Sequence, residues 1–292
     1  MNPGERGNFK LALAQMCVTW GDVRANLARA TKMIALAAGK GARVVLLPEA
    51  LDAGWTNPSS PAIAEGVPDG RACKTYRDAA RELGVYVCAG LTERAGTAVY
   101  NAAVLISPQG EVLLHHRKLN ELEIGHDIYA QGDRLGVAHT PLGTLGLMIC
   151  ADGSARGQVV TRTLGLMGAD VVLSPCAWAV PPGHDNAREN YGGLWRDCYG
   201  AAARDFRMWI AGCSSVGRLE GGPWDGHSCI GCSLVVDPDG RPVLTGPYGE
   251  KAEKLLLIDV KPAPRPARGS GWERLLPRRE EASEAGDREG KA

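Results

Sequence analysis

The chain has 292 residues, of which 45% are hydrophobic, enough for one large α/β domain or two small ones. Its 33 basic and 33 acidic residues cancel, which argues against a nucleic-acid or anionic-membrane surface, since both need a basic excess. The start lacks the apolar core of a signal peptide, and no apolar run approaches the ~20 residues of a membrane helix. We therefore expect a cytoplasmic protein whose partner is a small molecule or another protein.

The first half of the chain alternates between strands and helices. Apolar residues of the first predicted helix recur at helical spacing, and Gly39 and Gly41 end it. The turn Pro108-Gln-Gly110 joins two strands into a hairpin. In chain order we predict strand 10–16, helix 23–38, strand 43–47, helix 71–83, and strands 85–91, 99–107 and 111–115.

The second half repeats this order, which predicts two similar halves packed sheet against sheet with helices outside. Strands that alternate with helices, together with two hairpins, are typical of an α/β fold with mixed sheets. We predict strand 145–150, helix 157–167, strand 170–174, a long helix 185–206, and strands 208–213, 230–236, 242–244 and 254–260.

After Val260 the composition becomes rich in Pro, Arg and Glu. We therefore predict one domain over residues 1–262 and a tail over 263–292, with 278–292 disordered. The stretch 272–276 either packs on the body or on a partner subunit, or belongs to a mobile tail.

Three residues whose side chains could take part in catalysis, Glu49, Lys118 and Cys150, each lie at the end of a predicted strand. Glu49 comes directly after the buried run 43–47, where open α/β sheets place their ligands. Lys118 follows the hairpin, and Cys150 ends a strand before a helix, whose N-terminus lowers a thiol pKa. Taken singly, each has an ordinary interpretation: a loop carboxylate, a solvated lysine or a buried core cysteine. Their order along the chain is more specific.

At these residues the sequence resembles the nitrilase superfamily of carbon–nitrogen hydrolases. The resemblance runs from about residue 9 to 260 and leaves only the tail uncovered. Any one matching piece is weak, but the ordered set is specific. The matching pieces are Leu47-Pro-Glu49, Tyr100-Asn101, Arg117-Lys118-Leu119, Gly132-Asp133, Gly146 to Cys150-Ala-Asp152, Gly168-Ala-Asp170, Ser174-Pro175 with Trp178, and Gly231 to Gly240.

The resemblance implies a four-layer αββα sandwich that pairs into a homodimer or a higher homo-oligomer. It also implies that Glu49 acts as the general base, that Cys150 attacks the amide or nitrile carbon, and that Lys118 stabilises the developing negative charge. No metal or organic cofactor is required for this chemistry. The domain over residues 1–262 would then be the hydrolase domain.

Many members of this superfamily carry a second glutamate in the loop after the lysine. The usual spacing would place it near Gly125, which has no side chain to supply. Glu121 and Glu123 both lie close enough in sequence to substitute, and we favour Glu121 because it is near Lys118 in a turn.

Pocket residues are expected at strand ends and in loops. Trp178 corresponds to a pocket-lining position of the superfamily, and Trp55 and Tyr129 are further candidates, although each aromatic is more often part of a core. His126 and His184 lie in loops, where a histidine is usually solvated. The nine cysteines include one Cys-x-x-Cys pair, Cys229 and Cys232, but a zinc site needs a second pair or added histidines.

Several functions remain open at this point. An amidase or an N-carbamoyl amidohydrolase is the leading interpretation, and a nitrilase is its neighbour; Ala151 and Asp152, where true nitrilases often have Trp and Glu, favour amides. A catalytically silent scaffold with the same fold would not need all three residues. A papain-like hydrolase would need a histidine partner for Cys150.

Overall fold

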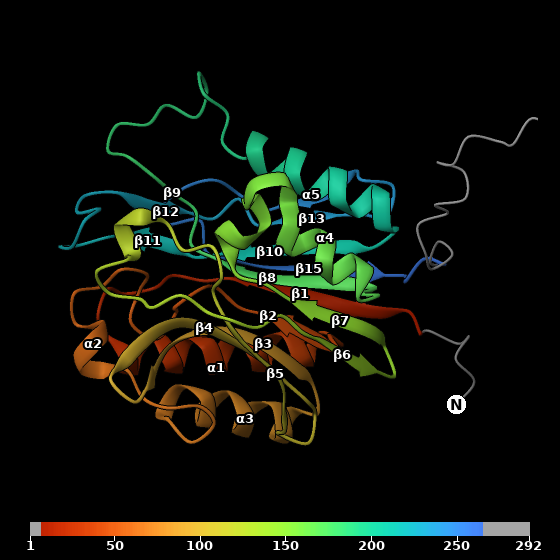
Figure 1. The fold of residues 1–292 in the computed structure, drawn as a ribbon, viewed down its shortest axis with the longest axis horizontal. Helices are drawn as coiled ribbons and strands as arrows, with labels where there is room; N and C mark the ends of the chain where they lie inside the picture. Colours follow the sequence, from red (N-terminus) through yellow and green to blue (C-terminus); the bar gives the residue numbers. More distant parts are fainter. Residues whose placement is uncertain (1–6, 265–292) are drawn as a thin grey trace, which may run out of the picture.

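The computed structural model describes residues 7–264 and consists of two six-stranded sheets packed face to face between helices (Figure 1). The first sheet contains, in spatial order, β15 (Lys254–Val260), β1 (Phe9–Gln15), β2 (Val44–Leu46), β3 (Tyr86–Ala95), β4 (Ala98–Ile106) and β5 (Val112–Arg117). The second contains β14 (Pro242–Thr245), β13 (Leu234–Val236), β10 (Trp209–Ser214), β8 (Val171–Cys176), β7 (Gly143–Leu147) and β6 (Val137–Thr140).

Helices cover the outer face of each sheet. In Figure 1, α1 (Val23–Gly39) and α3 (Arg71–Leu83) lie outside the first sheet, and α4 (Val159–Leu166) and α5 (Gly193–Phe206) outside the second. A short α2 (Ser60–Ile63) and a small sheet of β11 (Val216–Arg218), β12 (Ser228–Ile230) and β9 (Ala179–Val180) complete the body. This arrangement is the predicted αββα sandwich.

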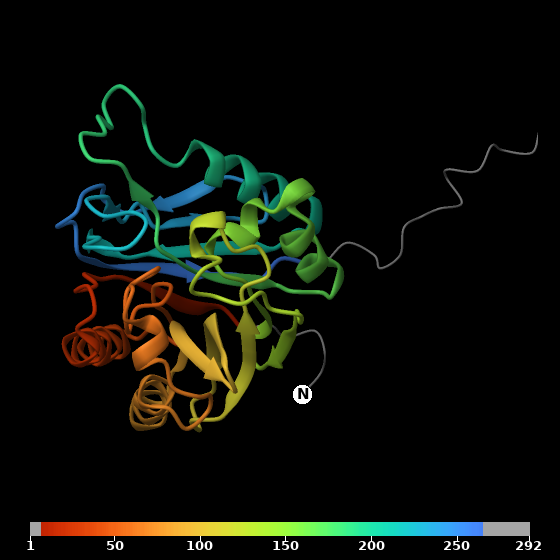
Figure 2. The same ribbon diagram turned by 60° about the vertical axis from the view of Figure 1, so that its left-hand side comes forward.

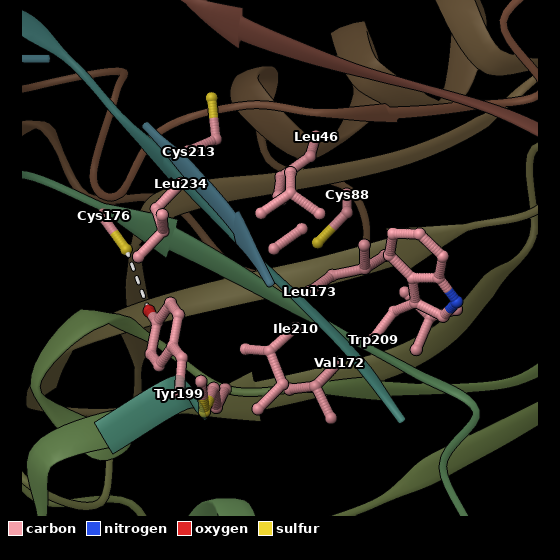
Figure 3. Packing of buried hydrophobic residues seen from close by; sticks show 14 of the residues in the cluster. Leu46, Cys88, Val172, Leu173, Cys176, Tyr199, Trp209, Ile210, Cys213 and Leu234 are labelled. Atoms are coloured by element: carbon pink, nitrogen blue, oxygen red, sulfur yellow. Dashed lines mark hydrogen bonds between the residues drawn. The ribbon is translucent and has the colours of Figure 1, made fainter. Parts of the chain in front are cut away.

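Successive side chains along each strand point to opposite faces of the sheet, so each strand contributes to two separate cores. In β1, Leu11 and Leu13 belong to the core between the sheets, whereas Ala12 and Ala14 pack in the core beneath α1. Figure 3 shows the core between the sheets, where Leu46 and Cys88 of the first sheet approach Leu173 of the second. Both sheets are therefore buried on two faces, which explains their nearly continuous apolar strands.

The long helix predicted over 185–206 is wrong in its first part, because α5 begins only at Gly193. Residues 181–192 form an extended loop that stands away from the body (Figures 1 and 2). Gly192 has a φ of +101°, which no helix tolerates. In the same loop, Asp185 and Asn186 accept hydrogen bonds from the backbone N–H groups of Ala187 and Tyr191, and such local bonds compete with helix formation.

The strand predicted over 230–236 is in fact two strands in different sheets. β12 ends at Ile230, and β13 begins at Leu234. Between them Gly231 and Cys232 have φ angles of +68° and +58°, and this left-handed backbone conformation ends the direction of β12 before β13 begins. The Cys229 and Cys232 thiols therefore lie on opposite sides of a backbone break and not along one strand.

The expectation of two similar halves is confirmed in the order of the strands, because β1-β2-β3-β4-β5 of the first sheet correspond to β7-β8-β10-β13-β14 of the second. Each sheet has one further edge strand outside this repeat. β15, the last strand described, returns to the first sheet and pairs antiparallel with β1 over its whole length, from Phe9 opposite Val260 to Gln15 opposite Lys254. The second sheet takes its edge from the hairpin of β6 and β7, and β6 was not predicted. Both ends of the described chain thus belong to one sheet.

Candidate active site

Glu49, Lys118 and Cys150 each follow the end of a strand, as predicted. Glu49 lies three residues after β2, in a segment that packs closely on Gly90 of β3: a Cβ atom there would fall 2.6 Å from the Glu49 Cα. Lys118 directly follows β5, and Cys150 lies three residues after β7, where it opens the 3-10 helix η2 (Cys150–Ser154). The first two residues come from the first sheet and the third from the second.

Lys118 bridges two glutamates. Its Nζ atom lies 2.7 Å from Oε1 of Glu49 and 2.8 Å from Oε1 of Glu121. The side chains of all three residues are at most 3% exposed. Charge-assisted hydrogen bonds of this length, shielded from water, hold an ammonium group rigidly.

Asn101 of β4 completes a closed ring with these three side chains. Its Nδ2 group donates to Oε1 of Glu49 at 2.7 Å and to Oε2 of Glu121 at 2.8 Å. Oε1 of Glu49 thus receives two donors, whereas its Oε2 atom is buried and has no hydrogen-bond partner among the residues described. One oxygen of the Glu49 carboxylate is left available for chemistry.

Cys150 occupies a strained position. Its φ angle is +43°, in the left-handed region that side-chain-bearing residues rarely adopt, and the residue is 7% exposed. The backbone N–H of Cys150 donates to the Ser174 hydroxyl at 3.1 Å. This hydrogen bond ties the strained backbone of the turn to β8.

Asp152 connects the cysteine turn to the segment that carries Lys118. Its Oδ1 atom accepts from the N–H groups of Leu119 and Asn120, and its Oδ2 atom accepts from the N–H of Ile149 at 2.9 Å and lies 2.8 Å from Nε2 of His116. The carboxyl group is fully buried. One side chain thus ties the turn that carries Cys150 to the segment that carries Lys118.

Burial dominates the electrostatics of the site. It raises the pKa of the Cys150 thiol well above its ordinary value; Cys176 and the Glu49 carboxylate act in the same direction, and Lys118 opposes them. This direction is opposite to the expectation that a helix N-terminus lowers that pKa, because η2 is a 3-10 helix of only five residues and desolvation outweighs it.

The two charged partners of the thiol respond differently to the same burial. Desolvation raises the pKa of Glu49, although Lys118 and the hydrogen bond from Asn101 act against it. Desolvation alone would lower the pKa of Lys118, but Glu49 and Glu121 outweigh it and raise that pKa well above its ordinary value. Lys118 therefore remains an ammonium group, whereas the Glu49 carboxyl group holds a proton more readily than usual.

Glu121, and not Glu123, contacts Lys118. Glu123 is exposed at the start of the 3-10 helix η1 (Glu123–Gly125). A Cβ atom at Gly125 would lie only 2.9 Å from Cγ of Glu121, so the glutamate side chain occupies the space that a side chain at position 125 would need. The glycine that seemed to leave the site incomplete makes room for the carboxylate supplied from position 121.

The three predicted pocket residues have different places. Nε1 of Trp55 donates to Oε1 of Glu121 at 3.3 Å, and the Lys118 ammonium lies 5.4 Å from the centre of the Trp55 ring. The hydroxyl group of Tyr129 accepts a hydrogen bond from the backbone N–H of Thr56, the residue after Trp55. Trp178 is buried on the side of the second sheet, where it stacks on Trp195. Only Trp55 touches the ring of charged residues, and the binding roles of all three remain predictions.

The histidines have other partners. Nε2 of His126 lies 3.3 Å from the backbone oxygen of Glu121, and His184 lies beside the Tyr248 ring. Within residues 7–264 no group of three or more His, Cys, Asp or Glu side chains is arranged to hold a metal ion. The same residues include no helix long and apolar enough to cross a membrane.

Comparison with known proteins agrees with this geometry. The carbon–nitrogen hydrolase family model matches residues 10–265. The chain belongs to the carbon–nitrogen hydrolase family. The predicted superfamily is thereby confirmed, and the protein is an enzyme that hydrolyses carbon–nitrogen bonds.

Two curated relatives and one solved structure illustrate the likeness. A Pyrococcus abyssi nitrilase is 34% identical over 177 residues, which is 59% of this chain and 66% of the relative. An Arabidopsis thaliana chloroplastic omega-amidase is 28% identical over 86% of this chain and 67% of its own length. The crystal structure of Saccharomyces cerevisiae Nit3 has a TM-score of 0.74 at 20% identity, covering 87% of this chain and 90% of that one, and confirms the fold.

Some residues of the site were not assigned a role from the sequence. Asn101, Asp152 and Ser174 belong to motifs that carried the resemblance, but nothing in their spacing indicated what they contact. Gly90 offered the one usable signal, since a glycine inside an apolar strand indicates a close backbone approach.

Proposed function

We propose that this hydrolase acts on small amides or carbamoyl compounds, with Cys150 as the nucleophile, Glu49 as the base, Lys118 as the electrostatic stabiliser and Glu121 as its support. The observation that carries the proposal is the buried Lys118 ammonium held at 2.7 Å and 2.8 Å between the two glutamates, beside a strained cysteine. The relative named an omega-amidase supports amides as the substrate class.

Acylation begins with proton transfer. Burial keeps the Cys150 thiol protonated, so the base must remove the proton as sulfur approaches the carbonyl carbon. Oε2 of Glu49, which has no other partner in residues 7–264, takes that proton. The new carbon–sulfur bond places negative charge on the carbonyl oxygen, which Lys118 stabilises in surroundings without water. The carbon–nitrogen bond then breaks, and the Glu49 carboxylic acid returns the proton to the departing nitrogen.

Deacylation repeats these steps with water. Glu49, again a carboxylate, takes a proton from a water molecule that attacks the thioester carbon. The carbon–sulfur bond breaks, the sulfur regains a proton from Glu49, and a carboxylic acid leaves. The raised pKa of Glu49 suits a group that must accept and return a proton twice in each cycle.

Ammonia release from a panel of small amides, carbamoyl-amino acids, carbamoyl-amines and nitriles tests the proposal. We expect wild type to release ammonia from amides or carbamoyl compounds, and Cys150→Ser to lose at least about 1,000-fold in rate because its hydroxyl is a far weaker nucleophile. Nitriles belong in the panel because one relative is named a nitrilase.

Cys73→Ser is the matched control, because Cys73 is equally buried but lies in α3 beneath the first sheet. It should keep wild-type activity. Equal activity of wild type and Cys150→Ser would show that Cys150 is not the nucleophile, and ammonia release from nitriles alone would replace the amide proposal by nitrile hydrolysis. No release from any compound would favour a scaffold.

We also propose that the protein forms a homodimer through the outer face of α4 and α5. Val159 and Leu166, seven residues apart in α4, and Leu194 in the first turn of α5 are 57%, 76% and 59% exposed. Large apolar side chains gathered on one surface commonly mark a protein interface. A second copy of the chain is the partner that the superfamily resemblance implies.

A further inference from the structure

Asn101 lies between two carboxylates that share one cation. Glu49 and Glu121 both bind Lys118, so the ring carries two negative charges against one positive charge in a buried place. In a poorly solvated interior, two carboxylates that share one cation repel each other. Something other than Lys118 must hold the second charge.

The orientation of the Asn101 amide follows from its neighbours. Its Nδ2 group has two hydrogen atoms, and one acceptor stands opposite each: Oε1 of Glu49 and Oε2 of Glu121. The reversed amide would place its oxygen against both carboxylates, which is strongly unfavourable. Asn101 therefore stabilises both negative charges while adding none of its own.

The same contacts decide which oxygen of Glu49 reacts. Oε1 accepts from Lys118 and from Asn101, each at 2.7 Å, so both of its lone pairs are engaged. Oε2 is buried without a partner in the described part of the chain. A proton arriving at Glu49 is thus directed to Oε2.

We propose that Asn101 is a positioning residue that holds the carboxyl groups of Glu49 and Glu121 in place and reserves Oε2 of Glu49 for proton transfer. This inference rests on the proposed function, since it takes Glu49 as the base. It adds a neutral residue to the machinery and predicts a change in the pH dependence of the reaction.

The groups that face Glu49 come from several elements. Lys118 follows β5, Glu121 lies in the next loop, Cys150 opens η2, and Cys229 belongs to β12. Within residues 7–264 the Glu49 carboxyl group accepts side-chain hydrogen bonds from Asn101 and Lys118. Removal of Asn101 acts in the direction that raises the Glu49 pKa.

The test compares wild type with Asn101→Leu, which keeps the approximate volume but donates no hydrogen bond. A hydrogen bond to a charged group has a strength that corresponds to a shift of about 1 to 2 pH units. Because Glu49 must be ionised to act, we expect the acid limb of the kcat/KM profile to move up by about that amount. Asn101→Ser, whose hydroxyl donates to one carboxylate only, should give a smaller shift in the same direction and serves if the leucine variant does not fold.

Asn26→Leu is the matched control. Asn26 is also a fully buried asparagine with three backbone contacts, but it lies in α1 and touches none of the four charged or nucleophilic groups. It should lower the thermal stability and leave the acid limb in place. If Asn101→Leu and Asn101→Ser also lose only stability, with an unmoved acid limb, Asn101 has a structural role and the proposal is wrong.

A readout without substrate separates this inference from the proposed function. The pH dependence of Cys150 alkylation by iodoacetamide, followed by mass spectrometry of the modified peptide, reports Glu49 through the thiol beside it. We expect its acid inflection to move in Asn101→Leu as the acid limb does. A moved inflection without ammonia release from any substrate would support Asn101 and contradict the amidase proposal, whereas ammonia release with an unmoved inflection would do the reverse.

Discussion

At the scale of single residues, the space beside Lys118 is shared by Glu121 and Gly125. The carboxylate fills the volume that a side chain at position 125 would occupy, and it bonds to Lys118, Asn101 and Trp55. Glu123, two residues further along, points to solvent. Both the presence of the glutamate and the absence of a side chain at 125 are therefore needed for the site.

Replacing the two glutamates separately tests this arrangement. Glu121→Gln removes a charge that holds Lys118, and we expect kcat/KM to fall by about 10- to 100-fold. Glu123→Gln should match wild type. Gly125→Ala pushes the Glu121 side chain away and should cost about tenfold in the same assay. Unchanged activity in Glu121→Gln, measured as ammonia release, would contradict a supporting role for this residue.

The sequence predicted the charged residues of the site better than the neutral ones. Glu49, Lys118 and Cys150 follow strands in a fixed order, and the structure places Nζ of Lys118 2.7 Å from Oε1 of Glu49. Glu121 was chosen correctly over Glu123 as the neighbour of Lys118 because three residues bring side chains together in a turn. Asn101 could not be assigned in this way, because its partners lie 52 and 20 residues away in sequence.

At the scale of elements, Asp152 joins two segments that belong to different sheets. The end of β5 carries Lys118, and the turn after β7 carries Cys150. Asp152 binds the backbone of both segments, and Asn120 returns a hydrogen bond to the oxygen of Ala151 at 2.6 Å. The position of the Cys150 turn relative to Lys118 therefore depends on this connection as well as on the packing of the two sheets.

Asp152→Asn tests the connection. An amide offers one acceptor oxygen where the carboxylate offers two, so at least one buried N–H group loses its partner, at a cost of about 1–3 kcal/mol in the free energy of unfolding. We expect that loss in urea denaturation, together with slower alkylation of Cys150. Asp237→Asn is the control, because Asp237 also accepts from two backbone N–H groups, but in an exposed turn where asparagine serves as well. Equal stability of the two variants would count against the connection.

Elements with a clear apolar period were predicted, and those defined by backbone geometry were not. β1, α1 and α3 agree with prediction within a residue or two because their apolar residues recur regularly. The break between β12 and β13 depends on the positive φ of Cys232, a conformation that its residue type does not indicate. The separate start of α5 depends on Gly192 and on local side-chain bonds in the preceding loop.

At the scale of the whole molecule, the two helix layers differ in their outer surfaces. α4 and α5 pack together through the ion pair of Arg162 with Asp205 at 2.7 Å and through Phe206, which fills the space that Gly165 leaves. Their outer side presents Val159, Leu166 and Leu194. On α1 the corresponding exposed apolar residue is Leu36 alone.

Light scattering after size-exclusion chromatography tests the proposed dimer. Wild type should have twice the chain mass of 30.9 kDa. Leu166→Asp places a charge at the most exposed apolar position of the face and should shift the protein toward the monomer, because a buried unpaired charge is costly. Leu36→Asp, on the opposite layer, should remain dimeric. A monomeric wild type, or a dimer unaffected by Leu166→Asp, would remove this face as the interface.

The return of β15 to the first sheet has a consequence for the order in which the protein becomes active during its synthesis. Glu49, Asn101 and Lys118 leave the ribosome early. The sheet that bears them lacks its edge strand, however, until residues 254–260 pair with β1. Cys150 meanwhile arrives with the second sheet, which must dock on the first to bring the thiol near Glu49. A nascent chain therefore carries every reactive group long before it can use them, and a reactive site assembles only when nearly the whole domain has left the ribosome.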